Sequence, residues 1–194
     1  KKVLFDLALQ ADVIVQNFRP GVADRLGVGY ATLSKIKPDL VYVSVSGYGQ
    51  DGPYANAPAT DSVMQADSGL MFSNQDEQGT PRRVGLLAVD VMTGLYASQG
   101  AATALYQRLA HKLGTHVQVS LFEACTAFQG ACFIEQTIAG KRPFGAVSAP
   151  NAVFDTLDGK LSVVTVNTDH FHRVCKALDR EVWITDPRYL ENEI

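Results

Sequence analysis

Strong charge, paired cysteines and long apolar runs are all missing from this sequence of 194 residues. Seventeen Lys and Arg against 20 Asp and Glu leave a formal net charge of −3, which excludes a strongly basic nucleic-acid binder. No apolar run reaches the roughly 18 residues that a membrane-spanning helix needs, and the first residues lack the pattern of a secretory signal. We therefore expect a cytoplasmic protein that binds neither nucleic acid nor membrane.

Cysteine and histidine are too few and too scattered to build a disulfide framework or a metal site. Cys125, Cys132 and Cys175 are odd in number, lack C-x-x-C spacing and lie among apolar residues, so we expect buried, reduced thiols. His170 and His172 form a close pair, but no third ligand follows at a matching spacing. We expect no bound metal.

Hydrophobic residues make up 46% of the chain, which is enough for a folded core. Residues 12–16 and 40–46 are short, β-branched runs typical of buried strands, and a helix over 30–37 is ended by Pro38. Strand, helix and strand predict a parallel βαβ unit with a right-handed crossover. The expected fold class is α/β, with a Rossmann-like parallel sheet and flanking helices.

The alternation of helices and strands continues through the middle of the chain. We predict helices over 60–68, 86–109 and 121–139, with a strand over 116–120. In the longest helix, apolar residues at steps of three, four and seven predict the face that packs on the core. These residues are Val91, Leu95, Ala102, Leu105 and Leu109. Small residues between them predict close approach of another backbone, since they otherwise weaken a helix.

Composition changes near residue 142 to Pro, Gly, Ser and Ala, and a β-hairpin with its turn at Asp158-Gly159 follows. These features predict a large domain over 1–142, a linker over 143–150 and the start of a smaller α+β domain over 151–194. The sequence begins without Met inside a helical pattern and ends without a closing element. We therefore expect it to be a piece of a longer chain.

Asp90 is the first candidate for chemistry, because it lies in the first turn of the long predicted helix. One interpretation is structural: acids there cap the helix or complement its dipole. The other is a carboxylate nucleophile, kept ionised by a pKa that the helix N-terminus lowers. The apolar approach over 85–89 would partly bury the acid, and burial without a role is costly.

Two loops that leave strands are candidate binding segments. Asn17, Phe18 and Arg19 precede a Pro-Gly turn, with Arg25 one helical turn later, and this set could stack on a nucleobase and pair with phosphate. The alternative is a surface turn with solvated arginines. The second loop, 47–52, fits the dinucleotide pattern G-x-G-x-x-G, but Pro53 and Pro58 leave no room for the helix that the pattern requires. A flexible glycine-rich loop is the favoured interpretation.

Taken together, these residues resemble the family III CoA-transferases in order and spacing over nearly the whole chain. The segments that carry the resemblance are 11–15 (ADVIV), 17–21 (NFRPG), 38–42 (PDLVY), 46–54 (SGYGQDGPY), Asp90 with Gly94, 149–151 (APN), 158–159 (DG) and 186–188 (DPR). Members of this family are about twice as long and form interlocked homodimers. The chain therefore resembles the middle of such a protein.

The resemblance implies transfer of CoA from an acyl-CoA to a carboxylic acid, through an aspartyl anhydride and an aspartyl-CoA thioester. Asp90 matches the reacting aspartate by position. Asn17, Phe18 and Arg25 match positions that hold the adenine and phosphate portion of CoA, and Arg19 lies beside them. Tyr48 matches a residue near the thioester. The loop residues Gly47, Gly49 and Gln50 are candidates to face the substrate.

Two alternatives to transfer stay open. The same family includes α-methylacyl-CoA racemases, which pair the aspartate with a histidine thirty residues earlier; that position is Thr60 here, and threonine cannot act as a base near neutral pH. This difference favours a transferase. A chain of this length could also bind CoA without catalysing its transfer.

Overall fold

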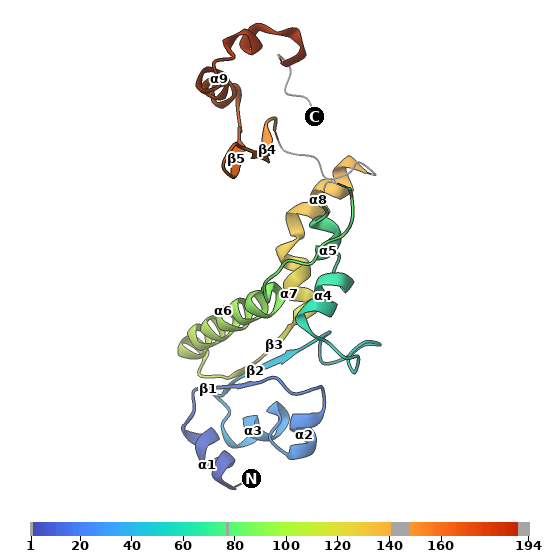
Figure 1. The fold of residues 1–194 in the computed structure, drawn as a ribbon. Coiled ribbons are helices and arrows are strands. Elements are labelled where there is room, and N and C mark those ends of the chain that lie inside the picture. The colour runs from blue at the N-terminus through green and yellow to red at the C-terminus, as the bar shows by residue number, and fades with distance from the viewer. Residues whose placement is uncertain (1, 77, 141–147, 190–194) are drawn as a thin grey trace. The chain divides into compact units, whose positions relative to one another are not determined.

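The computed structural model describes residues 2–76, 78–140 and 148–189 (Figure 1). Contacts divide the chain into two compact units, Lys1–Glu135 and Gln136–Ile194. Most of the predicted linker, residues 143–147, lies outside the described residues. Each unit is described by itself.

The first unit is built on a parallel sheet with strand order β1-β2-β3. The strands are β1 (Val13–Gln16), β2 (Val41–Ser46) and β3 (Thr115–Ser120). Every residue of β2 is buried, as expected for a middle strand covered on both faces. The predicted α/β class and the parallel pairing of the first two strands are confirmed.

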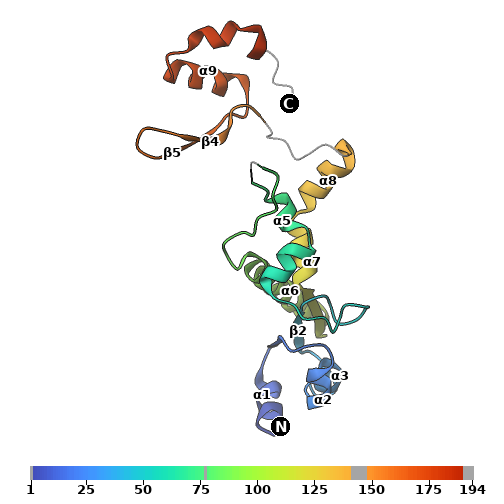
Figure 2. The same ribbon diagram turned by 45° about the vertical axis from the view of Figure 1, so that its right-hand side comes forward.

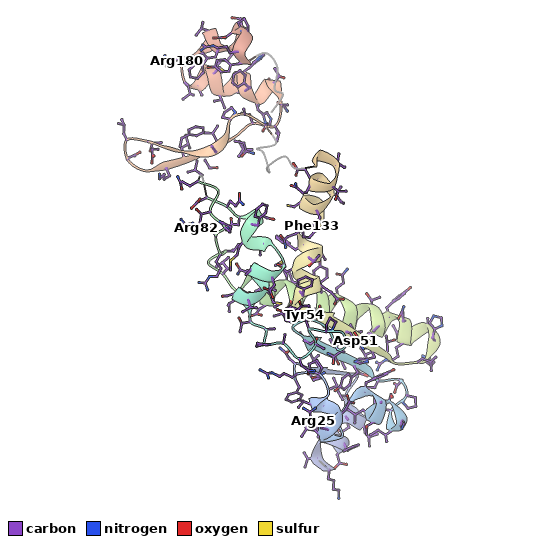
Figure 3. The ribbon with its side chains drawn as sticks, turned by 90° about the vertical axis from the view of Figure 1, so that its right-hand side faces the viewer. Arg25, Asp51, Tyr54, Arg82, Phe133 and Arg180 are labelled. Carbon is purple, nitrogen blue, oxygen red and sulfur yellow. The ribbon has the colours of Figure 1, made fainter. Side chains whose placement is uncertain are left out.

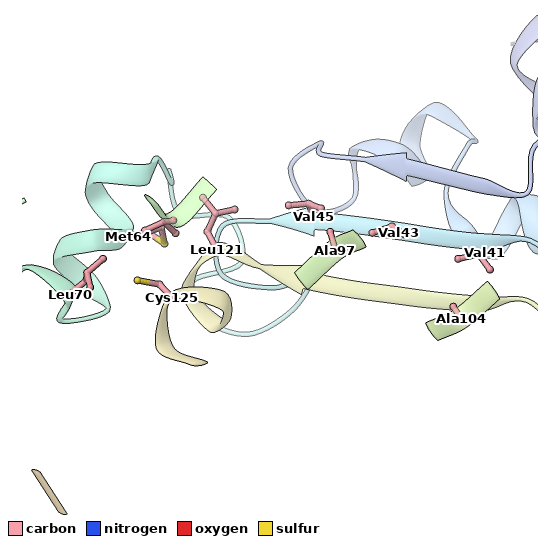
Figure 4. Close-up of a cluster of buried hydrophobic side chains, with 10 residues drawn as sticks. Val41, Val43, Val45, Met64, Leu70, Ala97, Ala104, Leu121 and Cys125 are labelled. Carbon is pink, nitrogen blue, oxygen red and sulfur yellow. The ribbon is translucent and has the colours of Figure 1, made fainter. Parts of the chain in front are cut away.

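Helices cover the two faces of this sheet (Figures 1 and 2). On one face lie α1 (Lys2–Gln10), α2 (Val22–Leu26) and α3 (Tyr30–Ile36), and on the other lies α6 (Ala88–His111). The remaining helices are α4 (Asp61–Asp67), α5 (Leu70–Ser73), α7 (Leu121–Phe128) and α8 (Gly130–Ala139). Tyr42 packs with Leu33 of α3 on one face, whereas Val41, Val43 and Val45 pack toward α6 on the other (Figure 4). The alternation along β2 therefore creates two separate cores.

The long helix α6 turns a different face to the core from the one predicted. Its buried residues are Val89, Thr93, Ala97 and Ala104. The predicted stripe is wrong for Val91, Leu95 and Leu109, which are 62%, 66% and 68% exposed, whereas Leu105 packs against the core as predicted. The small residues face the sheet because the backbones approach closely there; a Cβ on Gly100 would lie 2.7 Å from Cγ1 of Val117.

Three further sequence predictions are tested by local structure. The helix predicted over 121–139 is two helices, because α7 ends and α8 begins around Gln129, whose buried amide donates to the carbonyls of Ser68 (3.1 Å) and Cys125 (3.2 Å). No helix follows Gly52 directly; α4 begins at Asp61, so the dinucleotide interpretation of the glycine loop is excluded. The three cysteines are free thiols, with Cys132 only half-buried.

The second unit consists of a hairpin followed by helices. Its elements are β4 (Asn151–Asp155), β5 (Lys160–Val164), α9 (Thr168–Ala177) and the 3₁₀ helices η1 (Glu181–Thr185) and η2 (Pro187–Tyr189). The hairpin strands are antiparallel, as predicted. In the described segments, no helix combines the length and the apolar character that crossing a bilayer requires.

Candidate active site

A buried acid on α4 caps the start of α6. Oδ2 of Asp61 accepts the main-chain N–H groups of Val89 (2.8 Å) and Asp90 (3.1 Å), and Oδ1 accepts Nε2 of Gln65 (2.6 Å). Leu87, the N-cap residue of α6, has no side chain that can serve these groups. Asp61 therefore fills the capping role that one interpretation of the sequence gave to Asp90.

Asp90 is exposed at the third position of α6 and lines a cavity of about 600 Å³. Asn17, from the loop after β1, lines the same cavity. Among the described residues, the Asp90 carboxylate forms no hydrogen bond or ion pair, and it is the only ionisable group that lines this cavity. The carboxylate is thus open to a ligand.

The surroundings of Asp90 raise its pKa, first through partial burial and then through the negative charge of Asp61. This direction is opposite to the prediction that the helix N-terminus lowers the pKa. Burial and the Asp61 charge therefore outweigh the effect of the helix N-terminus, whose first N–H groups bind Asp61. A raised pKa makes the ionised oxygen more basic and hence more nucleophilic.

The other predicted residues of the first loop lie away from this cavity's lining. Phe18 is 47% exposed and lines an apolar depression beside α1, whereas Arg19 lines a third cavity of about 190 Å³. Figure 3 shows Arg25 on α2, and a Cβ on Gly21 would lie 3.1 Å from its Nη1 atom. Neither arginine forms an ion pair with a described residue. Both guanidinium groups therefore lack a carboxylate partner within the described chain.

Tyr48 lines a separate cavity of about 640 Å³ with Tyr54 and Phe122. Its hydroxyl donates a hydrogen bond to Asp67, and this bond raises the pKa of Tyr48 to about 12. Tyr48 is therefore a neutral phenol near neutral pH. Leu121 lines the cavity of Asp90 and Phe122 lines that of Tyr48, so the first turn of α7 borders both.

The glycines of the second loop are required by space and by backbone conformation. A Cβ on Gly47 would lie 2.2 Å from that of Ala59, and the main-chain carbonyl of Gly47 accepts the N–H of Phe122 at 3.0 Å. Gly49 has a φ of 101°, which only glycine adopts readily. Gln50 lines the same cavity as Arg19, and its buried Nε2 has no partner among the described residues.

Sequence reasoning missed two polar groups near these cavities. One is Asp61. The other is His116, which stacks on Tyr30 with ring centroids 4.6 Å apart and forms a hydrogen bond with Oγ of Ser44 at 2.8 Å. Burial lowers the pKa of His116. The parallel register brings His116 opposite Tyr42 of β2, but the sequence alone does not establish this pairing.

Comparisons with known proteins agree on one family. The model of CoA-transferase family III matches residues 1–194. The chain is 38% identical over 199 residues to acetyl-CoA:oxalate CoA-transferase of Acetobacter aceti and 33% identical over 199 residues to human succinyl-CoA:glutarate CoA-transferase. These matches cover 99% and 100% of this chain but 51% and 45% of the relatives. The chain thus spans about half the length of the curated relatives it matches.

Solved structures support the same assignment. A CaiB/BaiF family protein from Brucella suis has a TM-score of 0.85 and 27% identity, over 98% of this chain and 52% of the other. A hypothetical protein from Mycobacterium tuberculosis has a TM-score of 0.87 and 26% identity, over the same shares of the two chains. The family match extends over every residue and agrees with the fold. The chain belongs to CoA-transferase family III.

Proposed function

We propose that the protein transfers CoA from an acyl-CoA to a carboxylic acid, with Asp90 as the nucleophile. The observation that carries this proposal is a carboxylate without a partner among the described residues, at an open cavity, on a helix whose N-terminal N–H groups are served by another acid. The names of two relatives, which pair acetyl-CoA with oxalate and succinyl-CoA with glutarate, support this reaction class.

The proposed reaction starts from the ionised carboxylate of Asp90. Its oxygen attacks the acyl carbon of the donor, the C–S bond breaks, and a mixed anhydride and CoA thiolate form. The thiolate attacks the side-chain carbonyl of Asp90, which releases the donor acid as a carboxylate and leaves an aspartyl-CoA thioester. The acceptor carboxylate attacks this thioester and expels the thiolate. The thiolate then attacks the acceptor carbonyl and returns Asp90 to its free form.

No step of this sequence moves a proton, because every nucleophile enters and every leaving group departs as an anion. The cavity fits this demand, since Asp90 is the only ionisable residue in its described lining. Val15, Val43, Val45 and Leu121 also line it. Apolar walls limit the access of water, which would otherwise hydrolyse the anhydride.

CoA binding is proposed for two loops, the one that follows β1 and the one that follows β2. Asn17 lies in the lining shared with Asp90, and Arg19 and Arg25 have no ion-pair partner among the described residues. Unpaired guanidinium groups suit the phosphates of CoA. Tyr48, held neutral by its bond to Asp67, offers an aromatic face near the start of α7.

Racemisation is the less favoured alternative. A racemase needs two groups that exchange a proton with the α-carbon of the substrate, and the described lining of the cavity provides one ionisable group. Thr60, at the position of the racemase histidine, serves as the N-cap of α4 and accepts the N–H of Val63 at 3.4 Å. Exchange of an α-hydrogen for deuterium in the absence of an acceptor acid would favour the racemase.

Covalent trapping tests the proposal. The full-length protein is incubated with acetyl-CoA in the absence of an acceptor acid, reduced with borohydride and digested for mass spectrometry. We expect reduction of the Asp90 thioester to a homoserine side chain. An Asp6→Asn variant, which changes an acid on α1, should label normally, whereas Asp90→Asn should not label. A modified residue other than Asp90 would contradict the proposal.

We also propose a homodimer, as the family resemblance implies. The large apolar residues that α6 turns away from its sheet support a further covering surface. Light scattering of the purified full-length protein measures the molar mass in solution. A monomer at micromolar concentration would contradict this assembly.

A further inference from the structure

The buried carboxylate of Asp61 is held by hydrogen bonds and not by a cation. The residue is 5% exposed, and no described Lys or Arg forms an ion pair with it. Its partners are the main-chain N–H groups of Val89 and Asp90 and the side-chain amide of Gln65. Burial of an acid is costly without such donors, so Asp61 and the first turn of α6 stabilise each other.

Gln65 extends this contact to the segment that leads into α6. It lies one turn after Asp61 on α4, which places both side chains on the same face of the helix. Its Nε2 donates to the carbonyls of Val84 (3.3 Å) and Leu86 (3.2 Å), and its Oε1 accepts the N–H of Val84 (2.9 Å). One face of α4 therefore fixes the chain on both sides of Leu87.

This arrangement has a consequence for the side chain of Asp90. An acid in the first turn of a helix is attracted by the free main-chain N–H groups there. Here two of those groups, including the N–H of Asp90 itself, already bind Asp61. The Asp90 side chain is left to face the cavity that it shares with Asn17.

We propose that Asp61 is a positioning residue: it holds the first turn of α6 so that the Asp90 carboxylate is presented to the acyl-CoA. The proposal rests on the proposed function, in which Asp90 is the reacting group. Asp61 is not among the residues that line the cavity, and it acts through the main chain of Asp90.

Asp61 also influences the basicity of Asp90. Its charge is the second cause, after burial, of the raised pKa of Asp90. The other residues described in the cavity lining, from β1, β2, α6 and α7, carry no ionisable group. Removal of the Asp61 charge should therefore lower the pKa of Asp90, since Asp61 is the charge that raises it.

A pair of variants separates position from charge. Asp61→Ala removes both the cap and the charge, and Asp61→Asn keeps an acceptor for the main-chain N–H groups but removes the charge and the acceptor for Nε2 of Gln65. For Asp61→Ala, we expect kcat to fall by about 10² with KM for the acyl-CoA within about twofold, because the nucleophile is misplaced while the binding loops are unchanged. For Asp61→Asn, we expect most of kcat to remain at neutral pH and the acidic limb of the rate profile to move to lower pH.

A readout independent of turnover is the modification of Asp90 by a carbodiimide, followed against pH by mass spectrometry without substrate. The midpoint should move to lower pH in Asp61→Asn. The control Ser62→Ala removes a neighbouring hydrogen bond on α4, the one from Arg83 at 2.9 Å, and should change neither kcat nor the midpoint.

The results of these variants distinguish a failure of the positioning role of Asp61 from a failure of the proposed function. Unchanged kcat in Asp61→Ala, or a loss confined to KM, would overturn the positioning role and leave Asp90 as nucleophile. If Asp61→Ala does not fold, an unshifted midpoint in Asp61→Asn would show that Asp61 does not lie against Asp90 in solution, and it would overturn the positioning role. Full turnover in Asp90→Ala would instead overturn the proposed function, whatever the Asp61 variants do.

Discussion

At its two ends, α6 carries residues of opposite charge that meet different surroundings. Near the C-terminal end, the Arg108 side chain is 18% exposed and its Nη2 lies 2.8 Å from Oδ1 of Asp12, while Nη1 lies 3.7 Å from Oδ2 of Asp39. Near the N-terminal end, Asp90 has no ion pair among the described residues. One end pairs its charge with the loops that enter β1 and β2, and the other leaves its charge facing a cavity.

The main chain is also packed more closely at the C-terminal end of α6 than at the N-terminal end. After the C-terminal end, Gly114 donates its N–H to the carbonyl of Pro38 at 2.8 Å, and a Cβ at Gly114 would lie 2.1 Å from the carbonyl oxygen of Leu40. Before the N-terminal end, a Cβ at Gly85 would meet nothing within 4 Å. The C-terminal end of α6 is therefore fixed by ion pairs and close packing, whereas the N-terminal end presents an unpaired carboxylate. Substitutions at the two ends should affect stability and turnover separately.

The largest expected effect is on turnover at the N-terminal end. Asp90→Ala should lower kcat by about 10⁴ or more, because no other described group in the cavity can replace the nucleophile. Its CoA affinity and its unfolding midpoint should stay near those of the wild type. Steady-state kinetics and CoA titration by calorimetry measure the two effects. A fall of less than tenfold would show that the reacting group lies elsewhere.

The second effect is on stability at the C-terminal end. Gly114→Ala should lower the free energy of unfolding by about 2–3 kcal/mol, because the added methyl group would overlap main-chain atoms of Leu40 that cannot move independently. Gly85→Ala is the matched control and should change stability by less than about 0.5 kcal/mol. Urea unfolding compares the two. Equal stability of both variants would mean that the close approach at Gly114 is not maintained in solution.

A smaller effect is expected when the charge pairing is removed. Arg108→Met keeps much of the apolar stem and should cost about 1–2 kcal/mol, since the arginine is mostly buried but Asp12 is 71% exposed and screened. The loss should shrink in high salt, and kcat for the folded fraction should not change. A loss of kcat without a loss of stability would contradict a purely anchoring role for this end.

The sequence predicted the positions of the strands and helices better than their contacts. The runs that became β1, β2 and β3 were recognisable because they are β-branched and bounded by turns. The buried face of α6 was not, since side-chain size alone favoured Val91 and Leu95 over Ala97. Which face is buried depends on how closely the sheet approaches, and this is a tertiary property.

The sequence also predicted some residues of the candidate site and missed others. Asp90 and Asn17 were both predicted. They line one cavity because the C-terminal end of β1 and the N-terminal end of α6 both border it. Asp61 was not predicted as its partner, because an acid after Thr60 looks like an ordinary first-turn residue. Its two main-chain partners lie 28 and 29 residues away, and no local pattern indicates a contact over that separation.

The smallest expected effect concerns the stability cost of the unpaired charge. Because the folded pKa of Asp90 is raised above the ordinary value of an aspartate, this group favours the folded state at low pH, and that contribution is lost as the pH rises through the folded pKa. At neutral pH, Asp90→Asn should therefore be more stable than the wild type, by less than about 1 kcal/mol because the side chain is exposed. Urea unfolding at progressively lower pH should reduce the difference, since protonation of Asp90 removes its charge. A wild type that is more stable than Asp90→Asn at neutral pH would mean that the carboxylate has a stabilising partner, and the contrast between the two ends of α6 would fail.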